Sequence, residues 1–272
     1  MHSIHPTAAV SRECELDSDV EVGPGCVITG KVRLGRGVRL IGNVYVSGPV
    51  TIGEGTILYP FACVGFPGQD FKFKIGDPTA GVVIGKNSIL REHTTVHAAT
   101  KADKPTTVGD NVLMMCSAHV GHDAVVQNRA ILVNGAALGG HAFLGEGGTI
   151  SAHSALHQFG RVGRLAFVSA SIAISLDVLP FCMVAFRDVM AGLNLVGLRR
   201  SGMPREHITE LRQTYRDAFR TFRTRDEMLS ILEERGRSCP PVAEWYEFVK
   251  DKRRAICPGH RMQAAESDAE VV

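Results

Sequence analysis

Histidines are crowded in the middle of this chain, and imidazole is the side chain best suited to proton transfer near neutral pH. Seven of the eleven lie between residues 93 and 157: His93, His97, His119, His122, His141, His153 and His157. His122 is followed by Asp123, a carboxylate that could orient the ring or stabilise its charged form. The pair favours general base catalysis, and the alternative is a zinc site built from His93, His97, His119 and His122.

The elements that position these histidines follow from a repeat of six residues. A residue that is always aliphatic, here called an anchor, recurs at every sixth position, with two interruptions. A period of six is neither the two of a strand nor the 3.6 of a helix, so short strands joined by tight turns are expected. The 26 anchors are Ile4, Val10, Leu16, Val22, Ile28, Leu34, Leu40, Val46, Ile52, Leu58, Val64, Ile84, Leu90, Val96, Val108, Met114, Val120, Val126, Leu132, Leu138, Leu144, Ile150, Leu156, Val162, Val168 and Ile174.

Three such strands make a coil of 18 residues, and coils stacked at the spacing of parallel strands, ~4.8 Å, form a β-helix with the anchors inside. Val120, Leu138 and Leu156 are 18 residues apart and therefore share one edge on consecutive coils. His122, His141 and His157 follow them within three residues. These three histidines are thus predicted to crowd one edge within about 10 Å, facing outward or at a corner.

The chain is predicted to divide into a β-helix over residues 1–180 and a C-terminal helical domain over 181–257, with a disordered tail at 258–272. Residues 66–82 and 98–107 leave the repeat as loops, and insertions in a solenoid often lie on its binding face. The second, rich in lysine and proline, fits a simple surface loop equally well. Three helices are expected. The first spans Pro204 to Phe222, the second begins at a capping box formed by Thr224 and Glu227, and the third begins at Pro240.

Composition excludes several classes of protein. A net charge of +2 against 58 charged residues gives no field of the kind that marks nucleic-acid binders. Seven cysteines without a CxxC pair indicate reduced thiols in a cytoplasmic protein. No targeting segment and no apolar run long enough to insert into a membrane is present. A soluble cytoplasmic protein is expected.

Several segments, in order along nearly the whole chain, resemble UDP-N-acetylglucosamine O-acyltransferase, the family that performs the first step of lipid A biosynthesis. They are IHPTA at 4–8, QDFKF at 69–73, SAHVGHD at 117–123, GGH at 139–141, ALHQF at 155–159 and GLNLVGLRRSG at 192–202. The resemblance implies a left-handed β-helix, a hand that general crossover rules would not favour. It also implies a homotrimer whose active sites lie between neighbouring β-helices.

The resemblance further implies that a 3-hydroxyacyl group passes from acyl carrier protein to the 3-hydroxyl of UDP-N-acetylglucosamine, with no cofactor or metal. His122 would be the general base, Asp123 its support and the Gly140 N–H the oxyanion hole. Arg199 would help to dock the acidic carrier protein. Contacts to the sugar, the diphosphate, the nucleotide or the donor's phosphopantetheine arm would come from Gln69, Asp70, Lys72, His119, His141, His157, Gln158, Asn194 and Arg200.

Three positions depart from the family pattern. Val196 stands where an acidic residue is common and Ser201 where a basic one is, so nucleotide recognition is expected to differ. Ala170 aligns with a glycine that can set acyl chain length, which predicts a somewhat shorter preferred chain.

Other functions stay open at this point. They are a related acyltransferase with a 3-amino or 2-amino acceptor sugar, a coenzyme A dependent acetyltransferase, a zinc enzyme like the hexapeptide-repeat carbonic anhydrases, and an inert scaffold. The 2-amino sibling normally carries an extra domain before its repeat, whereas the repeat here begins at Ile4.

Overall fold

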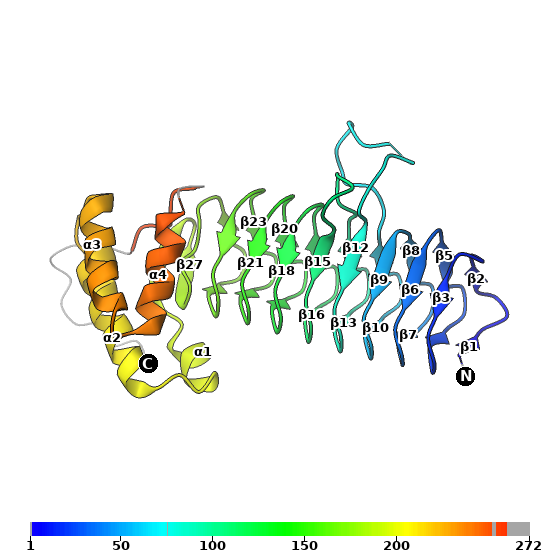
Figure 1. Cartoon of the computed structure of the whole chain (residues 1–272), viewed down its shortest axis with the longest axis horizontal. Coiled ribbons are helices and arrows are strands. Elements are labelled where there is room, and N and C mark those ends of the chain that lie inside the picture. The colour runs from blue at the N-terminus through cyan, green and yellow to red at the C-terminus, as the bar shows by residue number, and fades with distance from the viewer. Residues whose placement is uncertain (1, 75, 252–253, 260–272) are drawn as a thin grey trace.

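A computed structural model describes residues 2–74, 76–251 and 254–259. It is a parallel β-helix of three sheets with a group of helices at one end (Figure 1). Partners in neighbouring coils are 18 residues apart wherever no loop intervenes, as in His119, Ala137 and Ala155. The predicted fold class is therefore confirmed.

Each coil contributes one short strand to each sheet. The first sheet holds β1 (Ser3–Ile4), β4 (Glu21–Val22), β7 (Arg39–Leu40), β10 (Ile57–Leu58), β13 (Ile89–Leu90), β16 (Leu113–Met114), β19 (Ile131–Leu132), β22 (Thr149–Ile150) and β25 (Phe167–Val168), and continues into β27 (Cys182–Phe186) and β28 (Val189–Leu193). The second holds β2 (Ala9–Val10), β5 (Val27–Thr29), β8 (Tyr45–Ser47), β11 (Cys63–Val64), β14 (Thr95–Val96), β17 (His119–Val120), β20 (Ala137–Leu138), β23 (Ala155–Leu156) and β26 (Ala173–Ile174). The third holds β3 (Glu15–Leu16), β6 (Val32–Leu34), β9 (Val50–Ile52), β12 (Val82–Ile84), β15 (Thr106–Val108), β18 (Val125–Val126), β21 (Phe143–Leu144) and β24 (Arg161–Val162).

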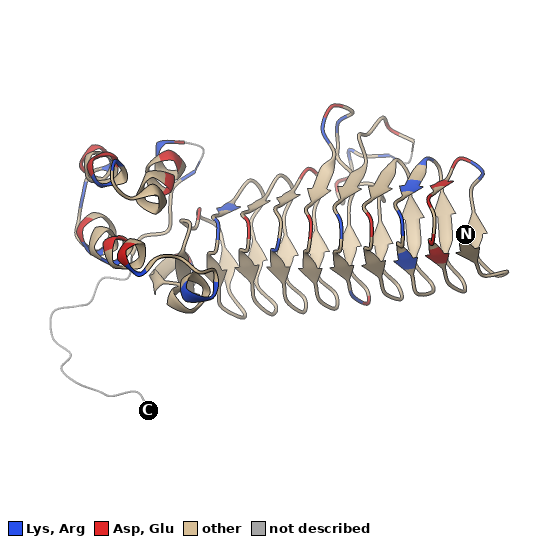
Figure 2. Cartoon of the chain, turned by 60° about the horizontal axis from the view of Figure 1, so that its bottom comes forward, with Lys and Arg blue, Asp and Glu red and all other residues tan. Residues whose placement is uncertain are grey.

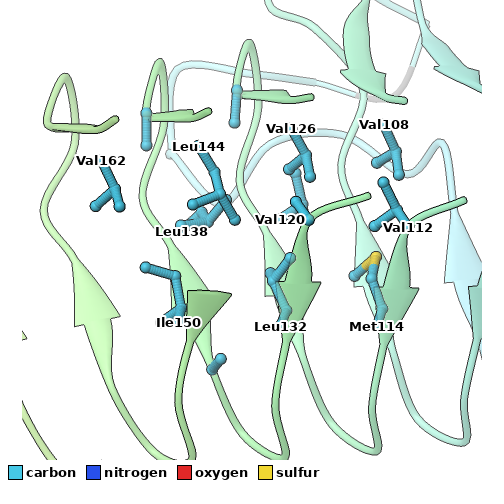
Figure 3. Close-up of a cluster of buried hydrophobic side chains, with 14 of the residues drawn as sticks. Val108, Val112, Met114, Val120, Val126, Leu132, Leu138, Leu144, Ile150 and Val162 are labelled. Atoms are coloured by element: carbon cyan, nitrogen blue, oxygen red, sulfur yellow. The ribbon is translucent and has the colours of Figure 1, made fainter. Parts of the chain in front are cut away.

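The anchors form the core of the β-helix. All of them are buried except the first three, Ile4, Val10 and Leu16, and Ile4 is 40% exposed. Figure 3 shows anchors from all three sheets meeting inside the coil. The first coil is more exposed because no coil lies beyond it to cover its side chains.

Two loops leave the coil at residues 65–81 and 97–105, each between a strand of the second sheet and one of the third. We call the row of turns at this boundary the histidine edge. Backbone hydrogen bonds join the loops, from Ala98 N to Phe66 O at 2.9 Å and from Ala80 N to Lys101 O at 2.7 Å. The loops rise together from one side of the β-helix (Figure 1).

The segment after Pro180 does not begin as a helix. Its first part forms the antiparallel hairpin β27–β28. Met183 and Val184 of β27 pair with β25, so the hairpin extends the first sheet by two strands. The helices are α1 (Leu195–Arg200), α2 (Arg205–Tyr215) with a π-helical turn at Arg216–Arg220, α3 (Arg225–Gly236) and α4 (Pro240–Lys250).

The predicted helices are present, and the capping box at Thr224 and Glu227 opens α3. None of the described helices is long and apolar enough to cross a membrane. Figure 2 shows basic and acidic residues mixed over the helices and along the coil edges. Of the predicted tail, Pro258 and Gly259 lie against Met190, and the remainder is outside the described residues.

The helical end is fixed to the last coil by buried polar contacts. Trp245 of α4 is fully buried and donates its ring N–H to the Pro180 carbonyl at 2.7 Å. Arg161 of β24 forms ion pairs with Asp177 at 2.7 Å and with Asp251, just beyond α4, at 3.0 Å. These contacts join the β-helix to the helices, and of the side chains that make them Trp245, Arg161 and Asp177 are almost fully buried while Asp251 is partly exposed.

Candidate functional site

The histidine edge brings the predicted catalytic residues into one row. His122 and Asp123 occupy the turn between β17 and β18, and His141 occupies the equivalent turn one coil later. The rings of His122 and His141 are perpendicular with centroids 5.2 Å apart, and His141 stacks on Phe159 of the next turn at 4.6 Å. Residues at these turns lie outside the core, so their side chains are free to meet a ligand.

His122 and Asp123 form a hydrogen-bonded pair. The His122 Nδ1 and the Asp123 Oδ2 are 2.8 Å apart, and each side chain is less than one-fifth exposed. A proton on Nδ1 donated to the carboxylate leaves Nε2 unprotonated, as a base requires. A methyl group at Gly140 would lie 2.6 Å from Nε2, so the backbone of this glycine directly borders the reactive nitrogen.

The Asp123 carboxylate accepts hydrogen bonds from Thr100 as well as from His122. Thr100, from the second loop, donates its hydroxyl to Oδ2 at 2.8 Å and its backbone N–H to Oδ1 at 3.1 Å. The Nε2 of His141 lies 3.6 Å from Oδ2. Burial alone would raise the pKa of Asp123, but hydrogen bonds from His122 and Thr100 outweigh it and hold this pKa below its ordinary value. Asp123 is therefore ionised at neutral pH.

His97 and His119 form a second, more buried pair of rings, with centroids 5.2 Å apart. His97 donates Nδ1–H to the Pro67 carbonyl at 2.6 Å, and the Nδ1 of His119 lies 2.7 Å from the Thr95 hydroxyl. Burial, with the neighbouring histidines, lowers the pKa of His119 to about 4, and burial also lowers that of His97. Both rings are neutral at pH 7 and can act on a ligand only as hydrogen-bonding groups.

We expect this burial to make stability fall in mild acid. The pKa of His119 is about 4 in the folded chain, against about 6.5 in an unfolded one, so only the unfolded state gains its proton as pH falls from 6.5 to 4. After allowance for solvent screening, His119 should account for about 1–2 kcal/mol of the loss by pH 5. Urea unfolding at pH 7.5 and 5.0 measures this, and His119→Gln should show the smaller pH dependence. Equal slopes in the two proteins would contradict it.

The first loop carries the predicted sugar-binding residues. Gln69, Asp70 and Lys72 are exposed, and Asp70 accepts a hydrogen bond from the Lys72 N–H at 3.0 Å. Phe73 packs against the ring of His122 with centroids 5.6 Å apart. The loop therefore contacts the base through Phe73 and carries exposed polar groups in the same segment.

His157 and Gln158 lie in the third turn of the row. The Gln158 carbonyl accepts a hydrogen bond from Arg254 at 2.6 Å, and a second nitrogen of this guanidinium lies 3.3 Å from the His157 Nδ1. Beside these turns and His141 opens a cleft of about 790 Å³, whose lining includes Lys101, Lys104, Phe143, Phe159 and Arg254. Asp103 and Asp123 also line this cleft, so its walls are aromatic and carry more cations than carboxylates.

Asn194 and Arg200 lie at α1, away from the histidine edge. Asn194 caps α1, accepting from the Gly197 N–H at 3.0 Å and donating to the Leu165 carbonyl at 2.9 Å. Leu165 lies on the edge between the third and first sheets, which is a different edge from that of His122. Arg200 is exposed on the same short helix. Within one chain these two residues do not join the histidine edge.

The four histidines of the zinc alternative are not brought together. The ring of His93 stacks on Phe61 at 5.0 Å, in a turn between the first and second sheets. Among the described residues, the group compact enough to hold an ion is His122, Asp123 and His141, whose ligand atoms lie within 4.8 Å of one another. Within one chain, the four histidines therefore do not form the ligand set of the zinc alternative.

Sequence reasoning missed several neighbours of the base. Thr100 is 23 positions from Asp123, Phe73 is 49 from His122, and Phe159 is 18 from His141. The sequence suggests His97 only as a zinc ligand. The signal available for Thr100 was its place in an insertion at the same edge as His122, which suggests proximity without naming a partner.

Comparisons with known proteins agree along almost the entire chain. A family model described as UDP-N-acetylglucosamine O-acyltransferase, domain 2, matches residues 177–257. An acyl-(acyl-carrier-protein)–UDP-N-acetylglucosamine O-acyltransferase of Thermodesulfovibrio yellowstonii is 38% identical over 259 residues, covering 94% of this chain and all of the relative. One from Stutzerimonas stutzeri is 36% identical, with 94% and 99% covered. The crystal structure of a Francisella novicida UDP-N-acetylglucosamine acyltransferase superposes with a TM-score of 0.91 at 29% identity, covering 98% of this chain and all of that one.

Proposed function

The chain belongs to the UDP-N-acetylglucosamine O-acyltransferase family, and we propose from this membership and its site that it makes the first acyl transfer of lipid A biosynthesis. The donor is a 3-hydroxyacyl group on acyl carrier protein and the acceptor is the 3-hydroxyl of UDP-N-acetylglucosamine. The observation that carries the proposal is the His122–Asp123 pair, set with Nε2 against the backbone of Gly140.

The chemistry follows from this pair. Nε2 of His122 takes the proton of the sugar hydroxyl as its oxygen attacks the thioester carbonyl, and Asp123 stabilises the imidazolium that forms. Among the described residues, no acceptor takes the N–H of Gly140, so it can donate to the oxyanion of the tetrahedral intermediate. Collapse breaks the carbon–sulfur bond, and the thiolate of the carrier's prosthetic arm recovers the proton from His122. An ester has formed, and no covalent enzyme intermediate is required.

The polar residues around the base would bind the acceptor. His119 is neutral and half-buried, so it offers the sugar a hydrogen bond without a charge. His141 lies beside the base, and Gln69, Asp70 and Lys72 project from the loop above it. His157 and Gln158 contact Arg254, which lines the cleft together with Lys101 and Lys104. These cations supply the positive charge that suits a diphosphate.

We further propose that three copies assemble and that each site is completed by a neighbouring chain. Asn194 and Arg200 lie on a different edge from His122, so they can contact the same ligand only across an interface. The first sheet turns a row of aliphatic side chains outward, Ile57, Ile89, Leu113 and Ile131, which suits contact with another chain. Arg199, exposed on α1, would meet the acidic carrier protein.

The cytoplasm is the proposed location. All seven cysteines are free thiols in the structure, as a reducing compartment allows.

A transfer assay tests the function. Purified protein is mixed with UDP-N-acetylglucosamine and 3-hydroxyacyl carrier proteins of several lengths, and the acylated nucleotide sugar is measured. Product confirms the reaction. Its absence at every length, in folded protein, would refute the proposal, and the same assay with a 3-amino acceptor would then separate an altered sugar from a different reaction class.

Ala170 should limit the length of the acyl chain. It is exposed at the turn that precedes β26, and the strands β20, β23 and β26 turn only alanine outward, at Ala137, Ala155 and Ala173. This leaves an apolar strip from the histidine edge toward Ala170 for an acyl chain to follow. Ala170→Gly should raise kcat/KM for the longest donors, by about tenfold for one or two additional methylenes. An unchanged length preference would contradict this role.

A further inference from the structure

The two loops are hydrogen-bonded to each other beside the base, and the family's chemistry gives this pair of loops no role as a unit. Besides the backbone bonds given above, Ala99 N donates to the Gly81 carbonyl at 3.1 Å, and the Thr79 hydroxyl donates to the Ala99 carbonyl. The Gly81 N–H in turn donates to the Thr79 hydroxyl oxygen at 2.8 Å. Ala98 and Ala99 are consequently buried, and Thr100 follows them with its backbone fixed.

Thr100 is the point at which this loop pair reaches the reaction centre. Its hydroxyl lies 2.8 Å from the Asp123 Oδ2, and its N–H lies 3.1 Å from Oδ1 and 3.3 Å from Oδ2. One residue thus contacts both oxygens of the carboxylate. The backbone N–H of Asp123 donates to the hydroxyl of Thr106, the first residue of β15, at 2.7 Å. Asp123 is therefore held by Thr100 within the second loop and by the residue that follows the loop.

Two histidine rings, those of His122 and His141, lie close to the Asp123 carboxylate. Oδ2 is 2.8 Å from the His122 Nδ1 and 3.6 Å from the His141 Nε2. A small rotation of the Asp123 side chain would transfer its hydrogen bond from the base to the neighbouring ring. The two donors of Thr100 define the plane of the carboxylate and keep Oδ2 directed at His122.

We propose that Thr100 is a positioning residue for the acyl transfer described above, holding Asp123 in the orientation that supports His122 rather than His141. The inference rests on that proposed function. In this proposal the second loop orients the base through Thr100. The first loop, which carries residues proposed to bind the acceptor, is hydrogen-bonded to it.

Thr100→Val tests the role because valine has the shape of threonine but no hydroxyl. We expect kcat to fall about tenfold while KM for UDP-N-acetylglucosamine changes less than twofold, since Thr100 does not touch the acceptor. The acid limb of the kcat–pH profile should move to higher pH, because Asp123 with one donor fewer takes up a proton more readily. Thr100→Ser, which keeps the hydroxyl, should restore most of the activity.

Thr107→Val is the matched control. Thr107 follows the same loop, and its hydroxyl donates to the Pro105 carbonyl at 3.2 Å instead of to Asp123. This variant should retain wild-type kcat and an unshifted pH profile. Thermal unfolding of all the variants separates an altered site from a weakened fold.

The outcomes are distinct. If the wild type is active and Thr100→Val has the same kcat and pH profile, the role of Thr100 is overturned. The proposed acyl transfer is then unaffected. A loss shared equally by Thr100→Ser and Thr107→Val would show that the loop is only structural, which also overturns it. A wild type without transfer activity would instead overturn the proposed function itself.

Discussion

His122→Ala should lose about three orders of magnitude in turnover while its fold and assembly remain intact. A positioned general base typically contributes between 10² and 10⁴ in rate, and the water that replaces the ring is neither oriented by Asp123 nor basic enough. The side chain lies at a turn outside the aliphatic core, so its removal opens no internal cavity. Single-turnover and steady-state transfer rates measure the loss, and circular dichroism with sedimentation checks the fold and the assembly.

His153→Asn is the matched control for this experiment. His153 is exposed at a turn between the first and second sheets, and its φ of 54° is one that asparagine tolerates. It should keep the wild-type rate. Near-normal turnover in His122→Ala would refute the general-base mechanism, whatever the result for the control.

Arg161→Met should destabilise the chain by about 3–5 kcal/mol, because it leaves the fully buried Asp177 without its cation. Burial already raises the pKa of Asp177 although Arg161 acts in the opposite direction. The loss of stability caused by Arg161→Met should become smaller as pH is lowered toward 5, since a protonated Asp177 carries no buried charge. Trp245, the only tryptophan, donates to the Pro180 carbonyl, so its fluorescence during urea unfolding reports on the same junction.

The control here is Arg33→Met, an exposed arginine at the equivalent strand position of the second coil. It should unfold within about 0.5 kcal/mol of the wild type, as is usual for surface substitutions. Both variants are compared at one protein concentration, because assembly contributes to apparent stability. An Arg161→Met protein as stable as Arg33→Met would show that the ion pairs do not hold the helices to the coil.

The β-helix was predictable because its signal is local and repeated. Each anchor faces inward on its own, so a residue such as Val126 needs no knowledge of its partners to be placed, and the 18-residue spacing then assigns His122 and His141 to one edge. The helices α2 and α4 were predictable from their apolar stripes and prolines. The hairpin β27–β28 was not, because its pairing with β25 exists only after the preceding coils have formed.

The site could be predicted only in part, for the same reason. His122 and Asp123 are adjacent in the chain, and their contact follows from sequence. The contact between Thr100 and Asp123 depends on how a ten-residue insertion folds back, which no periodic pattern encodes. Asn194 depends on the resemblance alone, which assigns it to a ligand. Within one chain its side chain accepts from the Gly197 N–H of α1 and donates to the Leu165 carbonyl.

The two ends of the solenoid are unequal, and this inequality gives its unfolding a direction. The first coil is partly exposed at Ile4, Val10 and Leu16, whereas the last is covered by the hairpin and by Trp245. When each coil gains stability only from its neighbours, structure is lost from the end that has fewer of them. Backbone amides should therefore exchange with solvent earliest near the N-terminus and progressively later along the axis. The histidine edge, several coils inward, would then persist through fluctuations that have already opened the beginning of the chain.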